Sequence, residues 1–108
     1  MSPTDFSTQQ LNRQEARKLL AKIVGSGGQI IFKAHALKRI PERNLTTVDV
    51  INVLKSTDAK IISDGELVDG TFRYRLETSK ILVVVAFGSM GDYVIVVSTW
   101  YKEGRRRR

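Results

Sequence analysis

The chain has 108 residues, 42% of them hydrophobic, which allows one domain with a single two-layer core and leaves no room for a second domain. It has no cysteine and one histidine, which excludes disulfides, thiol nucleophiles and cysteine-based zinc sites, and its scattered carboxylates disfavour a Mg²⁺ site, so we expect no metal and no cofactor. Eighteen Lys and Arg residues against eleven Asp and Glu give a net charge of +7, which favours a polyanionic partner such as RNA.

The opening residues 1–10 are polar and aperiodic, and we interpret them as a flexible lead-in. They lack the charged-then-apolar pattern of a secretion signal. No apolar run in the sequence approaches the roughly 20 residues that a membrane-spanning helix needs. We therefore expect a cytoplasmic protein with a single domain over residues 11–102.

The first helix is predicted to begin after Asn12, whose side chain can cap the free amides while Glu15 reaches back in a capping box. The glycine-rich residues 25–28 end this helix. Its apolar face is predicted to consist of Leu11, Leu19, Leu20 and Ile23.

A strand and two shorter helices are predicted next. Residues 29–33 have the composition of a strand, and residues 35–40 that of a short helical turn that ends at Pro41. Thr46 can cap a further helix that runs to Lys55.

The pattern changes after Ala59 to strands that are separated by turns. Asp69-Gly70 is a strong hairpin signal, and Thr78-Ser79 marks a second turn. Strands are predicted over residues 60–68, 72–76, 80–87 and 93–100. The third of these is apolar on both faces, as a central strand covered on both sides would be. The sequence thus predicts an α+β domain with helices on one face of a mainly antiparallel sheet of four to five strands.

Strict alternation in residues 72–76 places Phe72, Tyr74 and Leu76 on one face of their strand. If that face packs on the helices, Arg73 and Arg75 stand roughly 7 Å apart on the opposite face. Guanidinium groups suit phosphate because each offers a planar fork of donors and stays charged. An ordinary solvated sheet face is the alternative interpretation.

His35 lies where the predicted strand becomes a helical turn, with Arg39 one turn later and Arg43 beyond it. A histidine exchanges a proton near neutral pH, and neighbouring arginines can hold a phosphate beside it. A lone histidine at such a boundary is also typical of a helix cap or a core hydrogen bond, and both interpretations stay open.

Further candidates lie near the last two strands and in the tail. The candidates on these strands are Lys80, Tyr93, Ser98, Trp100 and Tyr101. A lysine or a tyrosine hydroxyl can stabilise the charge that develops on a phosphorane, whereas we assign Trp100 to the core. The basic tail over residues 103–108 ends in four of the eighteen positive charges, Arg105 to Arg108, and without these four arginines the chain has fourteen basic residues against eleven acidic ones. Its arginines would add salt-sensitive affinity for RNA, unless their charge serves solubility alone.

Residues 34–45 read Ala-His-Ala-Leu-Lys-Arg-Ile-Pro-Glu-Arg-Asn-Leu. This stretch resembles a bacterial family of domains of unknown function that share the pattern His-Ala-x-x-Arg-x-x-Glu-Arg-x-Ile/Leu. The Phe-Arg-Tyr-Arg strand at residues 72–75 and the hydrophobic hairpin at residues 81–100 follow in the same order, so the likeness covers about residues 30–101. The order of elements is also similar to that of RelE-type and motility-quorum-sensing-regulator-type toxins, which are metal-independent mRNA endonucleases.

The resemblance implies a RelE-like fold, with helices on one face of a curved sheet, and a toxin of a bacterial toxin–antitoxin system. It also implies two partners, RNA (mRNA in these toxins) and a cognate antitoxin protein, which can form an oligomer with the toxin. The catalytic residues that we expect are His35, Arg39, Arg73, Lys80 and Tyr101. The RNA-binding residues that we expect are Arg43, Tyr74, Arg75, Arg105 and Arg106.

Metal-free RNA cleavage needs a base for the 2′-hydroxyl, cations on the phosphate and an acid for the leaving 5′-oxygen. This sequence contains side chains for each role, and DNA lacks the hydroxyl that the route requires. Our leading hypothesis is therefore a metal-independent RNA endonuclease. The alternative is a non-catalytic module that binds RNA or another protein.

Overall fold

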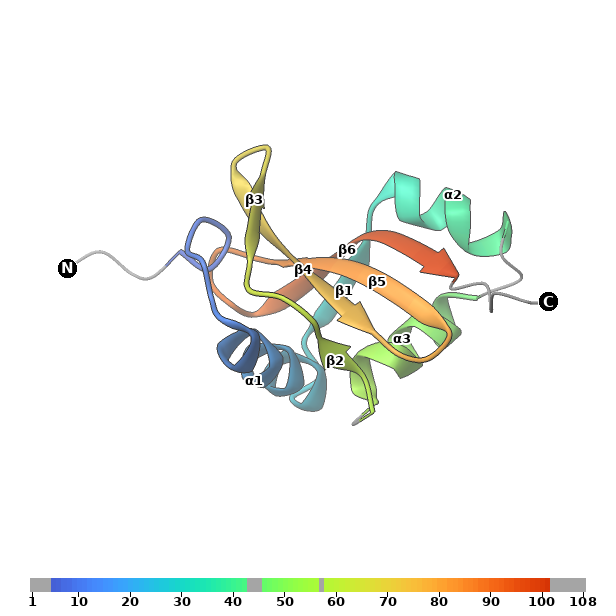
Figure 1. Cartoon of the computed structure of the whole chain (residues 1–108), viewed down its shortest axis with the longest axis horizontal. Helices are drawn as coiled ribbons and strands as arrows, with labels where there is room; N and C mark the ends of the chain where they lie inside the picture. The colour runs from blue at the N-terminus through green and yellow to red at the C-terminus, as the bar shows by residue number, and fades with distance from the viewer. Residues whose placement is uncertain (1–4, 43–45, 57, 102–108) are drawn as a thin grey trace.

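Residues 5–42, 46–56 and 58–101 are described by the structure, which is a computed structural model (Figure 1). The elements in chain order are α1 (Arg13–Gly25), β1 (Gln29–Phe32), α2 (Ala34–Glu42), α3 (Thr47–Lys55), β2 (Lys60–Ile61), β3 (Glu66–Val68), β4 (Thr71–Glu77), β5 (Ile81–Phe87) and β6 (Tyr93–Tyr101). The α+β class is therefore confirmed. No helix in the described part of the chain has the length and apolar character needed to cross a membrane.

The sheet has six strands in the order β1-β6-β5-β4-β2, with β3 also paired to β4. Strands β4, β5 and β6 form the predicted antiparallel meander. Strand β1, however, pairs parallel with the first half of β6, with Gln29 opposite Tyr93 and Phe32 opposite Val96. The sheet is therefore mixed and larger than predicted, because a strand from the start of the chain is added at its edge.

The predicted strand over residues 60–68 is interrupted and forms two short strands, β2 and β3. Gly65 lies at the break, directly against the ring of Tyr74, where a Cβ atom would come within 2.7 Å of Cε2. The Asp69-Gly70 turn is confirmed: both residues have positive φ, 51° and 84°, as a tight hairpin of the type I′ family requires.

The predicted helix starts are confirmed by two capping boxes. The Asn12 side chain accepts from the Glu15 amide at 2.8 Å, and the Glu15 carboxylate accepts from the Asn12 amide at 3.0 Å. Thr46 and Asp49 form the same reciprocal pair at the start of α3. Helix α2 runs one residue past Pro41, beyond the predicted end, since a proline in the last turn removes only one helical hydrogen bond.

The core lies between the helices and one face of the sheet (Figure 1). Helix α1 contributes Leu20 and Ile23, α3 contributes Val50 and Leu54, and α2 contributes Ala36 and Ile40. From the sheet, alternate residues of β4, β5 and β6 point into this core, as predicted for β4: Tyr74, Leu76, Val83, Val85, Phe87, Val94 and Val96. The opposite face of the sheet, which we call the open face, has no helix packed on it among the described elements. Strand β5 is thus covered by helices on one side only, which corrects our prediction.

The start of the described chain is attached to the sheet, which corrects the flexible lead-in that we predicted for residues 5–10. The Phe6 amide donates to the Ser89 carbonyl at 3.0 Å, and the Phe72 amide donates to the Ser7 carbonyl at 2.9 Å. The Phe6 side chain also packs against the core. This segment therefore borders the open face beside the turn between β5 and β6.

Candidate functional site

A cavity of about 300 Å³ lies on the open face, near the turn between β5 and β6. Its floor comes from the central strands, with Arg73 on β4, Ala86 on β5 and Ile95 on β6. Ser7 of the attached N-terminal segment borders it, and Lys33, directly after the edge strand β1, reaches it from that edge of the sheet. Residues from four distant parts of the sequence therefore meet here.

Arg73 is one of two cations that line this cavity in the described part of the chain. It pairs with Ala86 across β4 and β5, and its side chain is half-buried. Its Nε atom is buried and has no hydrogen-bond partner among the described residues. Glu66 lies opposite Arg73 in the strand register, yet its carboxylate pairs with Arg75, with 3.5 Å between Oε1 and Nη2. A buried donor without a partner is costly, so an anion bound beside Arg73 would be stabilised.

Lys33 is held in place by its backbone, since its amide donates to the Val96 carbonyl at 3.0 Å and so extends the pairing of β1 with β6. Strands β6 and β5 lie between β1 and β4, which puts roughly 14 Å between the backbones of Lys33 and Arg73. Both side chains are long, and both line the cavity. The pair thus presents two positive charges to one hollow, an arrangement that suits a phosphate.

Tyr93 forms another wall of the cavity, and Gly88 is the residue that allows its position. The Tyr93 ring lies so close to Gly88 that any Cβ atom there would collide with it. The Gly88 amide also donates to the Tyr93 carbonyl at 3.0 Å, which closes the turn between β5 and β6. A tyrosine ring beside two cations provides a surface on which a base or a sugar can pack.

Tyr74 is not an RNA-binding residue in this structure, which corrects our prediction. Its side chain is fully buried, and its hydroxyl accepts a hydrogen bond from the Leu11 amide at 3.0 Å. Burial raises the pKa of this phenol above its ordinary value of 10.0, against the opposing effect of the Leu11 hydrogen bond. Tyr74 therefore anchors the start of α1 to the sheet and cannot reach a ligand.

His35 is exposed in the first turn of α2, two residues after Lys33. It lies beyond β1, so the strands β6 and β5 separate it from Arg73, and it does not line the cavity. The compact cluster of imidazole and guanidinium groups that we predicted is therefore not formed. His35 is linked to the cavity only through the chain, because Lys33, two residues before it, lines the cavity.

Lys80 lies far from the cavity, which corrects its predicted place in one catalytic site with Arg73. It is exposed in the turn between β4 and β5. Ala86, the partner of Arg73, is six residues further along β5, a separation of roughly 20 Å.

Arg75 stands on the open face as predicted, exposed and paired with Glu66. An exposed pair of this kind contributes little stability, so Arg75 can exchange it for another anion.

The remaining predicted residues have no described side chain. The backbone of Arg39 lies within α2, and that of Tyr101 ends β6. Arg43, Arg105 and Arg106 lie outside the described residues, as does the tail at 103–108.

Sequence reasoning missed Lys33 and placed Trp100 wrongly. Trp100 is 41% exposed and lies opposite Leu82 on the open face. The cause is a β-bulge at Val97, where the register passes from Val96 opposite Val85 to Ser98 opposite Val84. One extra residue reverses the alternation of the strand, so Thr99 points into the core and Trp100 points out.

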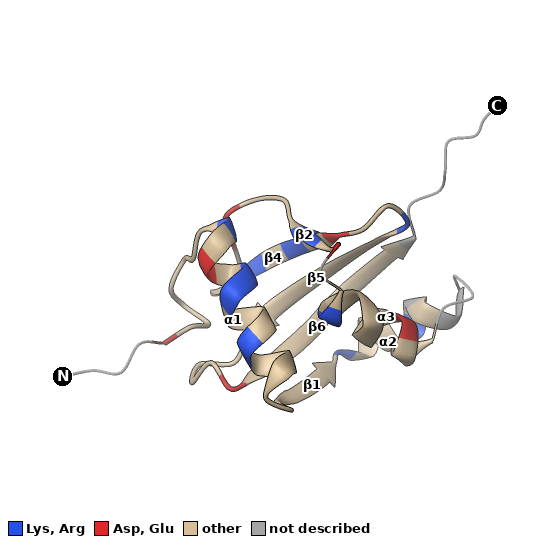
Figure 2. Cartoon of the chain, turned by 90° about the horizontal axis from the view of Figure 1, so that it is seen from below, with Lys and Arg blue, Asp and Glu red and all other residues tan. Residues whose placement is uncertain are grey.

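In Figure 2, which shows the molecule from the helix side, Lys and Arg residues lie on α1 and on the neighbouring strands β2 and β4. Groups of three or more His, Asp or Glu side chains with metal-binding spacing do not occur among the described residues.

No protein family model, curated protein or solved structure matches this chain.

Proposed function

We propose that this protein binds RNA across the open face of its sheet, with one phosphate in the cavity between Lys33 and Arg73, and cleaves the strand without a metal. The observation that carries the proposal is that Arg73 and Lys33 line the same cavity, while the buried Nε of Arg73 has no partner among the described residues. A phosphate oxygen there would complete the hydrogen bonding of Arg73 and neutralise both charges.

A single strand of RNA fits this face because an aromatic residue lies on it at a suitable distance. Trp100 is 41% exposed and lies two strands from Arg73 and four residues further along the sheet. That offset corresponds to roughly 16 Å, the span of a few nucleotides. A base could therefore stack on Trp100 while a phosphate of the same strand occupies the cavity.

The proposed reaction is attack of the ribose 2′-oxygen on the adjacent phosphorus. The new P–O bond forms as the bond to the 5′-oxygen breaks, which leaves a 2′,3′-cyclic phosphate and a free 5′-hydroxyl. One proton leaves the 2′-hydroxyl for a base, and another is delivered to the departing 5′-oxygen. Arg73 and Lys33 would stabilise the charge on the non-bridging oxygens, and His35, next to Lys33 along the chain, would exchange a proton.

We further propose that the protein is the toxin of a bacterial toxin–antitoxin pair, acts in the cytoplasm on mRNA and is neutralised by a cognate antitoxin. This part rests on the resemblance of residues 34–45 and 72–75 to the family described above and on the similarity of element order to RelE-like toxins. Overexpression in a bacterium should then arrest growth, and the Arg73→Ala variant should relieve the arrest. Normal growth with abundant folded wild-type protein would contradict the toxin assignment.

A non-catalytic RNA-binding module is the second candidate, and one observation favours it. The described residues that line the cavity include two cations and a tyrosine but no histidine, aspartate or glutamate. Such a cavity can hold a phosphate, while the proton transfers depend on His35, which does not line it.

Incubation with a defined RNA in EDTA, followed by analysis of the product ends, separates these candidates. The endonuclease proposal predicts fragments with 2′,3′-cyclic phosphate ends, formed at the same rate with and without the chelator. RNA that is bound but stays intact would identify the binding module. RNA that is neither bound nor cut would contradict both.

A further inference from the structure

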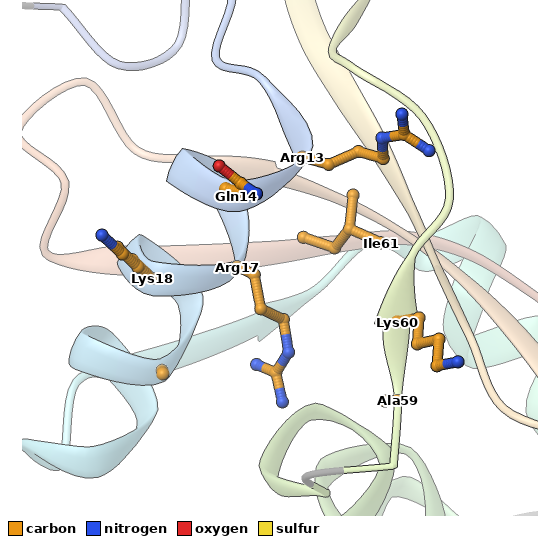
Figure 3. A pocket seen from close by; sticks show the side chains of 8 residues that line it. Arg13, Gln14, Arg17, Lys18, Ala59, Lys60 and Ile61 are labelled. Atoms are coloured by element: carbon orange, nitrogen blue, oxygen red, sulfur yellow. The ribbon is translucent and has the colours of Figure 1, made fainter.

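A second hollow, of about 760 Å³, lies between α1 and the edge strand β2 (Figure 3). We call it the α1–β2 groove. It is lined by Arg13, Gln14, Arg17, Lys18 and Ala21 from α1 and by Ala59, Lys60 and Ile61 from the other side. Four of these residues are cations and none is acidic, so the groove suits an anionic ligand.

Arg17 is a half-buried cation of the groove. Its Nη2 donates to the Ser56 carbonyl, at the end of α3, over 2.6 Å. Its Nη1 is buried and has no hydrogen-bond partner among the described residues. The guanidinium group is thus fixed in orientation while one of its donors still needs an acceptor. A carboxylate is a strong acceptor for such a donor.

Apart from Gln14, the rest of the lining is aliphatic. Ile61 points from β2 toward α1 in Figure 3, and Ala21 and Ala59 continue this surface. None of the residues that line the groove is aromatic. RNA recognition relies on stacking of bases on aromatic rings, which this groove lacks. Aliphatic side chains beside carboxylates, in contrast, are what an acidic peptide segment offers.

Strand β2 adds a reason to expect a peptide. It is the last strand in the sheet order, so one of its edges has no neighbouring strand among the described residues. Unpaired strand edges are common sites for the binding of extended peptides.

We propose that the α1–β2 groove binds an acidic segment of a partner protein that also carries aliphatic side chains. Its carboxylates pair with Arg13, Arg17 and Lys18, and its aliphatic side chains pack on Ala21 and Ile61. The cavity of Lys33 and Arg73 lies on the open face, whereas α1 lies on the helix side. The protein can therefore hold the peptide and an RNA at the same time, and the proposal does not depend on RNA cleavage.

The test measures binding of a short labelled peptide of alternating glutamate and valine to the full chain. A peptide of alternating glutamate and glycine has the same charge and serves as the ligand control. Wild-type protein should bind the valine peptide several times more tightly. Arg17→Gln should weaken that binding roughly tenfold or more, since it removes a charge-assisted hydrogen bond. Lys22→Gln, on an exposed position of α1 outside the groove, should leave it unchanged.

Ala21→Glu is a second variant that keeps the test informative if Arg17→Gln fails to fold. Ala21 is exposed, and glutamate is a good helix former, so the change places a carboxylate in the groove without disturbing the core. It should also weaken peptide binding. The proposal is overturned if wild-type protein does not bind the valine peptide, if both peptides bind equally, or if Lys22→Gln loses as much affinity. It is also overturned if Ala21→Glu weakens RNA binding as much as peptide binding, because the groove would then be an RNA contact.

Discussion

Lys33 and Arg73 line one cavity although two whole strands, β6 and β5, lie between the strands from which they extend. The parallel pairing of β1 with β6 brings Lys33 to the open face. The alternation of β4 turns Arg73 to the same face. Strand pairing thus fixes the backbone positions of both residues, and a rigid scaffold of this kind suits the binding of one phosphate by two cations.

Lys33→Gln should lower the salt dependence of RNA binding because one phosphate contact is lost. On single-stranded RNA, the slope of log Kobs against log salt should fall in magnitude by about 0.7. The measurement is RNA affinity over a series of salt concentrations. Lys38→Gln, which removes an exposed charge from α2 outside the cavity, is the matched control. Equal slopes for wild type and Lys33→Gln would show that Lys33 contacts no phosphate.

His35→Ala should reduce the rate of RNA cleavage by about 10²-fold or more, since a positioned acid or base contributes that much. RNA affinity should stay within about twofold of wild type, because His35 does not line the cavity. Single-turnover cleavage and equilibrium binding, measured on one RNA, separate the two effects. Leu37→Ala, also exposed on α2, should cleave normally. Cleavage at the wild-type rate by His35→Ala would remove the histidine from the mechanism.

Tyr74 should make stability depend on pH at the alkaline end. Burial raises its pKa in the folded protein above the ordinary value of 10.0, so the folded state disfavours the charged phenolate. The neutral phenol contributes its full stability below pH 10, and this contribution is lost as the pH rises above that value. Urea unfolding at a series of pH values measures the loss.

Tyr74→Phe supplies the comparison. At neutral pH it should cost about 1–3 kcal/mol, because the Leu11 amide loses its buried acceptor. Above pH 10 the gap in free energy of unfolding between wild type and variant should narrow, since only wild type has the phenol to ionise. A gap that stays constant over the whole pH range would contradict this account of Tyr74.

Asn12→Ala should lower the free energy of unfolding by about 1 kcal/mol, because the Glu15 amide at the start of α1 loses the Asn12 side-chain oxygen that accepts its hydrogen bond. Asn12→Ser keeps a good capping side chain and should stay within a few tenths of wild type. Chemical unfolding of the three proteins is the measurement. An alanine variant as stable as the serine variant would mean that the cap contributes nothing.

Features that depend on near neighbours could be predicted from the sequence. The two capping boxes, the Asp69-Gly70 turn and the buried face of β4 each follow from residues a few positions apart. Features that depend on distant pairing could not. Nothing near residue 29 indicates that β1 will run parallel to β6, and this pairing is what brings Lys33 to the cavity.

Two errors have a physical cause in the strands themselves. A single extra residue at Val97 reverses the direction of every later side chain in β6, so Trp100 faces outward. We also assigned Lys80 to one site with Arg73 on the chemistry of its side chain, yet the rise along the strands places Lys80 roughly 20 Å from Arg73. Alternation thus predicted the two faces of β4, but neither the face of Trp100 beyond the bulge nor which residues meet.

The most direct test of the phosphate site compares RNA binding by Arg73→Ala and Arg75→Ala at one salt concentration. Both variants remove one arginine from the same face of β4, but only Arg73 lines the cavity, while Arg75 is exposed and paired with Glu66. We predict a loss of affinity of roughly tenfold or more for Arg73→Ala, a much smaller loss for Arg75→Ala and an intermediate value for Arg73→Lys. Binding by folded Arg73→Ala with wild-type affinity would contradict the site.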